Sequence, residues 1–514
     1  MIPPQKRSIL RRRKPADDTG PALGQPVTGR IRAGTVPVLR VLRVRPPGAA
    51  LAAALLGFFV ITLDALVVNV ALPAIRTDLG GGMTGLQWVV DGYTLMFAAL
   101  LLSAGSLSDR VGARRAFALG LVVFMAASAA CGLALSLPAL IAARLVQGAG
   151  AAAMMPTSLA LIREAYADPV KRGRAVALWA VGGAVASAAG PVAGGAASLI
   201  SWRMIFFINL PVGVAALVLL AFAARSPGRA VPFDVTGQLS VVLAMGALTF
   251  AAIEAGSAGF AAPQVWAAAR LTVGAAAVFV RAQARGRHPM VPLELLRRRT
   301  VLISCGAGFA FMAAFYGMVF VLSIYLQQQR GLSALATGLT FVPMTVLSAF
   351  VNPLSARAAE RFGPRVPIGC GMYLMTCGLF SLALVPTGLP TWALALLMLP
   401  VGLGGPLAMP PTTALLVNSV PAHQTGTASG VFNASRQLGG ALAVAVFGAL
   451  IADQAHFLPG LRISLVLAAL TTLAAATASL FLRHTPAGAP EDDDPAAPSA
   501  VPRPAAPPST DNRA

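Results

Sequence analysis

Apolar residues gather along most of the chain in long blocks rather than alternating with polar ones. A helical block of about 20 apolar residues matches the roughly 30 Å hydrocarbon core of a bilayer. The pattern therefore predicts an all-α membrane protein with fourteen transmembrane helices, at residues 49–73, 87–107, 116–135, 137–162, 175–200, 204–224, 236–255, 263–280, 301–326, 336–354, 366–385, 392–417, 426–452 and 461–482.

The distribution of positive charge supports this count and sets the orientation. Four of the 39 Lys and Arg residues fall on one side, in loops (Arg76, Arg203 and Arg330) or at the outer start of the last span (Arg462), and three fall deeper inside predicted spans. The remaining 32 lie in the opposite loops and in both tails. Because cytoplasmic loops of membrane proteins are rich in Lys and Arg, we expect a multi-pass protein of the cell membrane with both termini in the cytoplasm.

Composition excludes two other classes of protein. Only 11% of the residues are charged and 57% are hydrophobic, whereas soluble domains carry about 25% charged residues. The net charge of +21 is not arranged as a basic groove interleaved with aromatic residues, so we expect no nucleic-acid partner. The expected partners are membrane lipids and a small hydrophobic molecule, and the chain is expected to act as a monomer.

The chain contains an internal repeat. The stretch "GSLSDRVGARR" (105–115) follows the second span, and "ARAAERFGPRV" (356–366) follows the tenth, 251 residues later. Six spans, two inserted spans and six further spans would place the two copies in this way. The sequence thus predicts two six-helix bundles related by a pseudo-twofold axis, an arrangement typical of transporters.

Five segments follow from these boundaries. Residues 1–48 are a basic tail rich in Pro and Gly, and residues 484–514 are rich in Pro, Ala and Asp, so both are expected to be disordered in the cytoplasm. The first bundle covers 49–224 and the second covers 300–483. Residues 225–299 hold the two inserted helices and a cytoplasmic linker.

Several motifs together resemble one family. The stretch at 105–115 is similar to the loop signature of the major facilitator superfamily, and "LIAARLVQGAGAA" (140–152) and "GPVAGG" (190–195) resemble signatures of its drug:proton antiporters. "LDALVVNVALP" (63–73), "WRMIFFINLPVG" (202–213) and "HPMVPLELLRRR" (288–299) resemble the fourteen-span branch. The resemblance covers roughly residues 49–482. It implies a bacterial exporter of drugs or antibiotics that alternates between two openings and uses the proton as its coupling ion.

The resemblance also implies roles for individual residues. Arg144 would take part in proton coupling. The gating loop would comprise Gly105, Asp109, Arg110, Gly112 and Arg114, with the Asp109 carboxylate docked on the start of the span near Gly426 to hold the inner gate shut. An ordinary charged cytoplasmic loop is the alternative.

Two charges inside predicted spans carry the chemistry. Asp64 and Arg144 both fall roughly 10–15 Å below the outer surface at a rise of about 1.5 Å per residue, so they can meet inside the bundle. Burial disfavours the ionised carboxylate and a neighbouring Arg favours it, so a change in surroundings can load or release a proton. A fixed structural ion pair is the alternative.

Further polar and small residues lie within the spans. Gly190, Pro191, Gly194 and Gly195 predict either a hinge or a tight packing seam in the fifth span. Asp91, Glu254 and Arg436 are secondary ionisable groups. We interpret Asp91 and Glu254 as lying near outer span ends with their carboxylates at the interface, and we name no partner for Arg436.

No motif supports an enzyme, a metal site or a bound cofactor. The chain lacks a phosphate-binding P-loop, an HExxH zinc motif and a GxSxG nucleophile elbow. The competing functions are an uptake symporter on the same fold and a receptor or membrane enzyme without transport. The "GPVAGG" signature favours export over uptake.

Overall fold

The computed structural model describes residues 47–224, 226, 234–286, 289–385, 388–421, 424–453 and 455–482, which all belong to one compact unit. This part of the chain is helical and contains no strand. Within it, eleven helices are long and apolar enough to cross a membrane, which makes the chain a multi-pass membrane protein. The two tails expected to be disordered lie outside the described residues, apart from Pro47 and Gly48.

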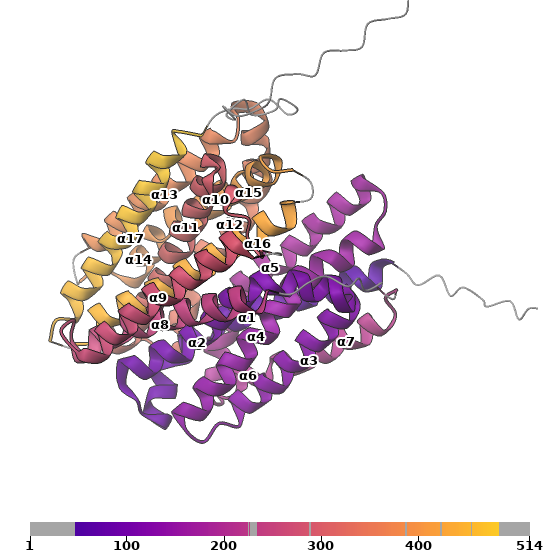
Figure 1. Cartoon of the computed structure of the whole chain (residues 1–514). Helices are drawn as coiled ribbons and strands as arrows, with labels where there is room; N and C mark the ends of the chain where they lie inside the picture. Colours follow the sequence, from indigo (N-terminus) through magenta and orange to yellow (C-terminus); the bar gives the residue numbers. More distant parts are fainter. Residues whose placement is uncertain are drawn as a thin grey trace, which may run out of the picture. The chain divides into compact units, whose positions relative to one another are not determined.

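The helices follow the predicted blocks in order (Figure 1). The first part of the chain forms α1 (Pro47–Leu79), α2 (Gly82–Val111), α3 (Ala113–Gly132), α4 (Leu137–Ala165), α5 (Pro169–Ser198), α6 (Met204–Phe207) and α7 (Asn209–Ala221). Between the two halves lie α8 (Val235–Ala258), α9 (Pro263–Arg285) and the short α10 (Leu293–Arg297).

The last part of the chain repeats this layout. It forms α11 (Arg299–Ile324), the π-helical turn η1 (Tyr325–Gln329), α12 (Ala334–Phe362), α13 (Arg365–Ala383), α14 (Thr391–Leu397), α15 (Leu399–Asn418), α16 (Thr425–Leu450) and α17 (Phe457–Ser479). Three further long helices, α2, α12 and α16, fall outside these eleven. The count of fourteen membrane-spanning helices therefore stays a prediction.

Two of the predicted spans are broken into helix pairs, and proline explains both breaks. The span expected at 204–224 is divided between α6 and α7 at Ile208, and Pro211 follows three residues later. The span expected at 392–417 is divided between α14 and α15 at Met398, two residues before Pro400. Proline has no N–H to donate and its ring collides with the carbonyl four residues earlier, so each break falls within that turn.

The helices contact one another in two equivalent sets. In the first set, α1 packs on α4, α5 and α7, α4 packs on α2 and α3, and α3 packs on α7. In the second set, α11 packs on α15, α16 and α17, α15 packs on α12 and α13, and α13 packs on α17. Each of these contacts of the first set has its counterpart in the second, as duplication of the chain predicts.

The turn after α2 is repeated after α12 as well. Gly112 has φ 85° and ψ 140°, and Gly363 has φ 78° and ψ 158°. Both residues end a long helix in a conformation that side chains with a Cβ rarely adopt. The two copies of the loop motif therefore share a backbone shape as well as a sequence pattern.

The inserted helices cover one contact between the two sets. The α8 helix packs against α9 and also against α2 of the first set and α16 of the second, and Figure 1 shows α8 and α9 side by side. The Trp88 ring of α2 lies 6.3 Å from the Phe250 ring of α8. The insertion is therefore built onto the α2–α16 contact rather than onto a single half.

The two sets meet through α2–α16 and α5–α12, near the helix ends that the charge pattern places outside. The Gln87 amide donates to the Ala445 carbonyl at 2.6 Å, and the Gln327 amide donates to the Val70 carbonyl at 3.1 Å. A Cβ built at Gly195 would lie 2.6 Å from the Leu335 Cα. These contacts join the two sets at one end of the helices.

Close approach of α2 and α4 makes Gly148 intolerant of a side chain. A Cβ there would overlap the carbonyl oxygen of Tyr93, whereas a Cβ at Gly274 in α9 meets open space. We expect Gly148→Val to lower the free energy of unfolding by about 1–3 kcal/mol, as overpacking does, and Gly274→Val to have a far smaller effect. Thermal unfolding of the purified variants in detergent measures this, and equal loss in both variants would contradict the packing described.

Candidate functional site

An ion pair lies in the interior of the first set. Asp64 of α1 and Arg144 of α4 are both fully buried, and Arg144 Nη1 lies 2.5 Å from Asp64 Oδ2. The structure therefore brings together the two charges that the sequence placed at similar depth. A buried pair of this kind is stable only when further hydrogen bonds satisfy both groups.

Two neutral amides complete the network. Gln147 Nε2 and Asn209 Nδ2 each donate to Asp64 Oδ1 at 2.8 Å. Gln147 Oε1 accepts from Arg144 Nη1 at 2.8 Å, so this one side chain touches both members of the ion pair. Three donors from α4 and α7 converge on the carboxylate, which is the arrangement that an ionised carboxylate accepts.

The Arg144 guanidinium is held from other sides as well. Its Nε donates to the Val89 carbonyl of α2 at 3.0 Å, and its central carbon lies 4.3 Å from the centre of the Tyr93 ring. Its Nη2 is buried without a hydrogen-bond partner, and so is the Asn209 amide oxygen. Since buried polar groups are normally paired, these two atoms mark where the network has room to exchange partners.

The surrounding sequence explains why these groups can meet. A Cβ at Gly150 of α4 would lie 2.7 Å from the Phe124 backbone nitrogen, so this small residue lets α4 approach α3. Ser128 of α3 accepts from the Asn209 amide at 3.0 Å and donates to the Phe206 carbonyl at 2.8 Å, which lies at the break between α6 and α7. The proline-induced break therefore sits beside the residue that reaches Asp64.

Gln147 and Asn209 were missed as site residues by the sequence reasoning. Both lie inside motifs that the sequence analysis quoted, at 140–152 and 202–213. Gln147 is three residues after Arg144 and therefore shares its helix face. That spacing was a usable signal, whereas nothing in the sequence places Asn209 next to Asp64.

The gating loop is described in part. Gly112 has the positive φ of a tight turn, and the Arg114 side chain donates from Nε to the Leu220 carbonyl at 3.1 Å and from Nη2 to the Ala221 carbonyl at 3.1 Å. Arg114 therefore binds the carboxyl end of α7, where the helix dipole favours a cation. Gly105 has open space around it, and Arg110 is exposed.

The docking of Asp109 stays a prediction. Its backbone belongs to α2, but its side chain lies outside the described residues. A Cβ built at Gly426, the expected partner region, would meet nothing within 4 Å.

The predicted hinge residues of α5 form two packing seams. A Cβ at Gly190 would lie 2.9 Å from the Leu66 Cβ, and one at Gly194 would lie 2.6 Å from the Val67 carbonyl oxygen, both on α1. Gly195 faces α12, and the Pro191 carbonyl lies against Gly338 of the same helix. The small residues thus let α5 approach both its own set and the other one, while a hinge motion stays a prediction.

Asp91 does not lie at an interface, contrary to the sequence interpretation. Its side chain is 0% exposed, and neither carboxylate oxygen has a hydrogen-bond partner. The prediction was wrong because Asp91 shares a helix face with Gln87, which contacts α16, so its side chain turns into the protein instead of reaching the membrane surface. Glu254 is half-buried four residues before the end of α8, where Ser257 hydrogen-bonds to it.

Arg436, the third secondary charge, lies on α16 without a carboxylate partner among the described residues. Its Nη1 donates to Asn433 Oδ1 at 3.4 Å. No group of three or more His, Cys, Asp or Glu side chains in this part of the chain is placed to hold a metal ion.

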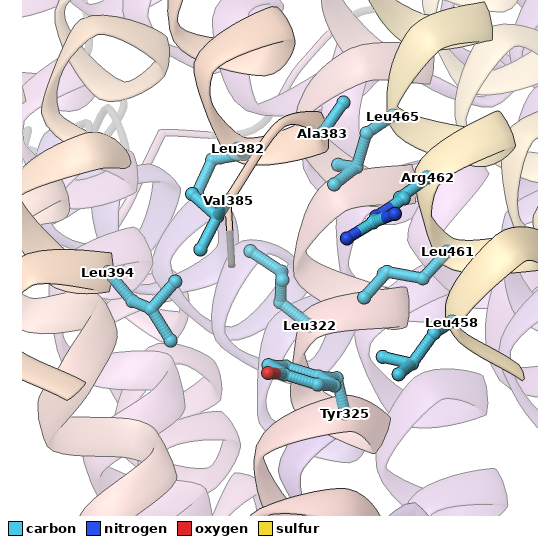
Figure 2. Close-up of a pocket in the computed structure, with 10 residues that line it drawn as sticks. All are labelled: Leu322, Tyr325, Leu382, Ala383, Val385, Leu394, Leu458, Leu461, Arg462 and Leu465. Atoms are coloured by element: carbon cyan, nitrogen blue, oxygen red, sulfur yellow. The ribbon is translucent and has the colours of Figure 1, made fainter. Parts of the chain in front are cut away.

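An apolar cavity lies elsewhere, within the second set. It is small, with a volume of about 30 Å³, and lies between η1 and the ends of α11, α13, α14 and α17 (Figure 2). Leucine side chains line most of it, and Arg462 is its one charged lining residue. None of the predicted site residues lines this cavity, so it is separate from the Asp64 network.

Comparison with known proteins identifies the family. The chain matches the Major Facilitator Superfamily over residues 54–444. The chain belongs to this superfamily. The match confirms the resemblance that the motifs carried, and a major facilitator superfamily member is a transporter rather than an enzyme.

Relatives of this superfamily member are named as resistance proteins. It is 36% identical to the methylenomycin A resistance protein of Bacillus subtilis, over 83% of this chain and 92% of the relative. It is 38% identical to the multidrug resistance protein Stp of Mycobacterium tuberculosis, over 77% of this chain and 74% of the relative. It is 34% identical to the tetracenomycin C resistance and export protein of Streptomyces glaucescens, over 80% of this chain and 77% of the relative.

Solved structures share the superfamily fold. A peptide transporter POT in complex with sulfate has a TM-score of 0.62 at 17% identity, covering 84% of this chain and 93% of that one. A D-xylose–proton symporter has a TM-score of 0.58 at 17% identity, covering 83% of this chain and 97% of that one. At this identity the likeness concerns the fold alone.

Removal of the bridging amide should weaken the network. Gln147→Leu keeps the side-chain volume but leaves both Asp64 and Arg144 short of a hydrogen-bond partner. We expect the free energy of unfolding to fall by about 1–3 kcal/mol, the cost of unsatisfied buried polar groups. Thermal unfolding in detergent measures it, with Gln264→Leu on the exposed face of α9 as the matched control. An unchanged midpoint in Gln147→Leu would show that the amide contributes nothing to stability.

Proposed function

We propose that the protein exports hydrophobic or amphiphilic drugs across the cell membrane in exchange for protons. The observation that carries the proposal is the buried Asp64 carboxylate, held by one cation and two amides in a chain whose relatives are named as resistance and export proteins. A carboxylate that is fully buried in a membrane helix is costly unless it is paired or protonated. It is therefore suited to carry one proton per cycle.

The proposed architecture has fourteen membrane spans and two bundles. The first bundle comprises α1–α7, the second comprises α11–α17, and α8 and α9 form the inserted pair. Both termini are proposed to be cytoplasmic, and the working unit is proposed to be a monomer. The support is the equivalent contact pattern of the two sets and the concentration of Lys and Arg in the predicted inner loops.

Alternating access follows from where the two sets touch. The contacts of Gln87 with α16, of Gln327 with α1 and of Gly195 with α12 all lie near the predicted outer ends. We infer that the described conformation has its outer side closed. Opening toward the outside then requires these contacts to separate and others to form at the inner ends, where the Asp109 loop is proposed to dock on α16.

Proton transfer is proposed to occur at Asp64. In the described conformation its oxygens accept from three donors, which is the deprotonated arrangement. Movement of α1 relative to α4 and α7 would remove donors and leave the carboxylate to take up a proton instead. The unpartnered Arg144 Nη2 and Asn209 oxygen allow the donors to shift without first breaking other bonds.

Asp91 is proposed as a second position that holds a proton. It lies one helical turn from Gln87, whose amide bonds to α16, so it shares the helix face that contacts the second set. An ionised carboxylate without any hydrogen-bond partner costs several kcal/mol in an apolar interior. When the two sets separate at this end, water reaches that face and the cost disappears.

The uptake symporter remains the competing function. In inside-out vesicles, an antiporter takes up drug when the lumen is acidified, whereas an uptake symporter releases it. A receptor or membrane enzyme would show neither response and would show binding or a reaction without flux.

Loss of the Asp64 proton site should abolish driven transport. We expect Asp64→Asn to reduce proton-gradient-driven drug accumulation in inside-out vesicles to the level without a gradient, because an amide cannot carry the proton. The assay compares this variant with Asp453→Asn, which changes an exposed carboxylate in the loop after α16.

A folding defect is distinguished by a second variant. Asp64→Glu keeps an exchangeable carboxylate and should retain part of the driven transport. Full activity in Asp64→Asn, at equal protein level in the membrane, would remove Asp64 from coupling.

A further inference from the structure

Arg436 of α16 is a cation with unused hydrogen-bonding capacity. Its Nη1 reaches the Asn433 side-chain oxygen at a long 3.4 Å, and its Nε is buried with no hydrogen-bond partner. The residue as a whole is only half-buried, so part of the guanidinium is accessible. An arginine in a membrane interior is expensive unless an anion or water offsets its charge.

Aromatic side chains surround this guanidinium. Its central carbon lies 5.8 Å from the Phe311 ring centre and 5.7 Å from that of Phe432. Phe315 stacks on Phe311 with a centroid distance of 5.9 Å, and Tyr316 meets Phe315 edge to face at 5.9 Å. The group therefore combines one cation with a continuous apolar and aromatic surface.

This surface faces the first set of helices. Tyr316 belongs to the same core cluster as Tyr93 and Phe97 of α2, and the half-buried Phe311 and Phe315 pack against that cluster. Arg436 therefore lies beside the meeting of the two sets, where a transported molecule must pass in an alternating-access cycle.

No carboxylate of the described residues pairs with this charge. From Arg299 to Leu482 the sequence contains two acidic residues, Glu360 and Asp453, and both are exposed near helix ends. Across the interface, Asp64 is already paired with Arg144, and the buried Asp91 of α2 forms no ion pair. Among the described residues, Arg436 thus has no ion-pair partner.

We propose that Arg436 and Asn433 bind the anionic group of the transported molecule, a carboxylate or an equivalent oxyanion on an aromatic or apolar body. The planar guanidinium forms paired hydrogen bonds with such a group. The Asn433 amide donates one N–H to the Ser429 carbonyl at 2.9 Å, and its second N–H can donate to the anion. Phe311, Phe315 and Phe432 would hold the apolar body. This inference rests on the proposed export function and makes it specific, since it assigns amphiphilic anions rather than cations as cargo.

Direct binding with three probes of one scaffold tests the charge preference. The probes are 2-naphthoate, its neutral methyl ester and the cationic 2-naphthyltrimethylammonium, titrated calorimetrically into the purified full chain in detergent. We expect naphthoate to bind tighter than the other two. Arg436→Gln should weaken naphthoate alone, by about tenfold or more, as expected for loss of a charge-assisted hydrogen bond.

Two further variants keep the test decisive. Arg436→Lys retains the positive charge but lacks the paired guanidinium N–H donors, so its loss of naphthoate affinity should be intermediate. This variant also tests the site if Arg436→Gln does not fold. Arg270→Gln, on the exposed face of α9, should leave all three affinities unchanged. Equal binding of the three probes, an equal loss of all three in Arg436→Gln, or no naphthoate binding to the unmodified protein would overturn the proposal.

The binding assay separates this inference from the export function. It uses no proton gradient, so it reports on the anion site alone. Intact naphthoate preference without gradient-driven flux in proteoliposomes would refute the export function and keep the anion site. Gradient-driven flux of the neutral and cationic probes, without any preference for the anion, would support the export function and refute the anion site.

Discussion

One buried carboxylate, which needs hydrogen bonds and a charge partner in place of water, governs the arrangement of the first set of helices. Asp64 is fully buried, and its oxygens take hydrogen bonds from Arg144, Gln147 and Asn209. Those donors come from α4 and α7, so three helices are tied to one ionised group. The same low polarity that makes the pair strong makes any change of partner a change in proton affinity.

This constraint matters for function because the partners belong to elements that pack through small residues. Gly148 and Gly150 bring α4 against α2 and α3, and Gly190 and Gly194 bring α5 against α1. Such seams bring the helix backbones close together. The equivalent contacts in the second set, together with the α2–α16 and α5–α12 contacts, support a motion in which one set rocks against the other.

The sequence predicted the helices well because lipid imposes a strict pattern of length and apolarity. Each of the fourteen predicted blocks coincides with one helix or with a pair divided near Pro211 or Pro400. The burial of Asp91 was missed because hydropathy does not show which face of α2 packs against other helices. Asn209 was missed for another reason, since a neutral amide in a span gives no charge signal and its contact with Asp64 depends on the fold. The side-chain bonds of Arg114 to the end of α7 were equally invisible.

If drug is exported in exchange for a proton carried by Asp64, cargo binding should displace that proton, and proton release on cargo binding tests this exchange most directly. Purified protein in weakly buffered detergent solutions that cover a range of pH is mixed with a transported drug and a pH indicator. The account predicts release of protons that saturates with the drug and is absent in Asp64→Asn. Saturable drug binding with no proton release at any pH, or equal release in the two proteins, would contradict it.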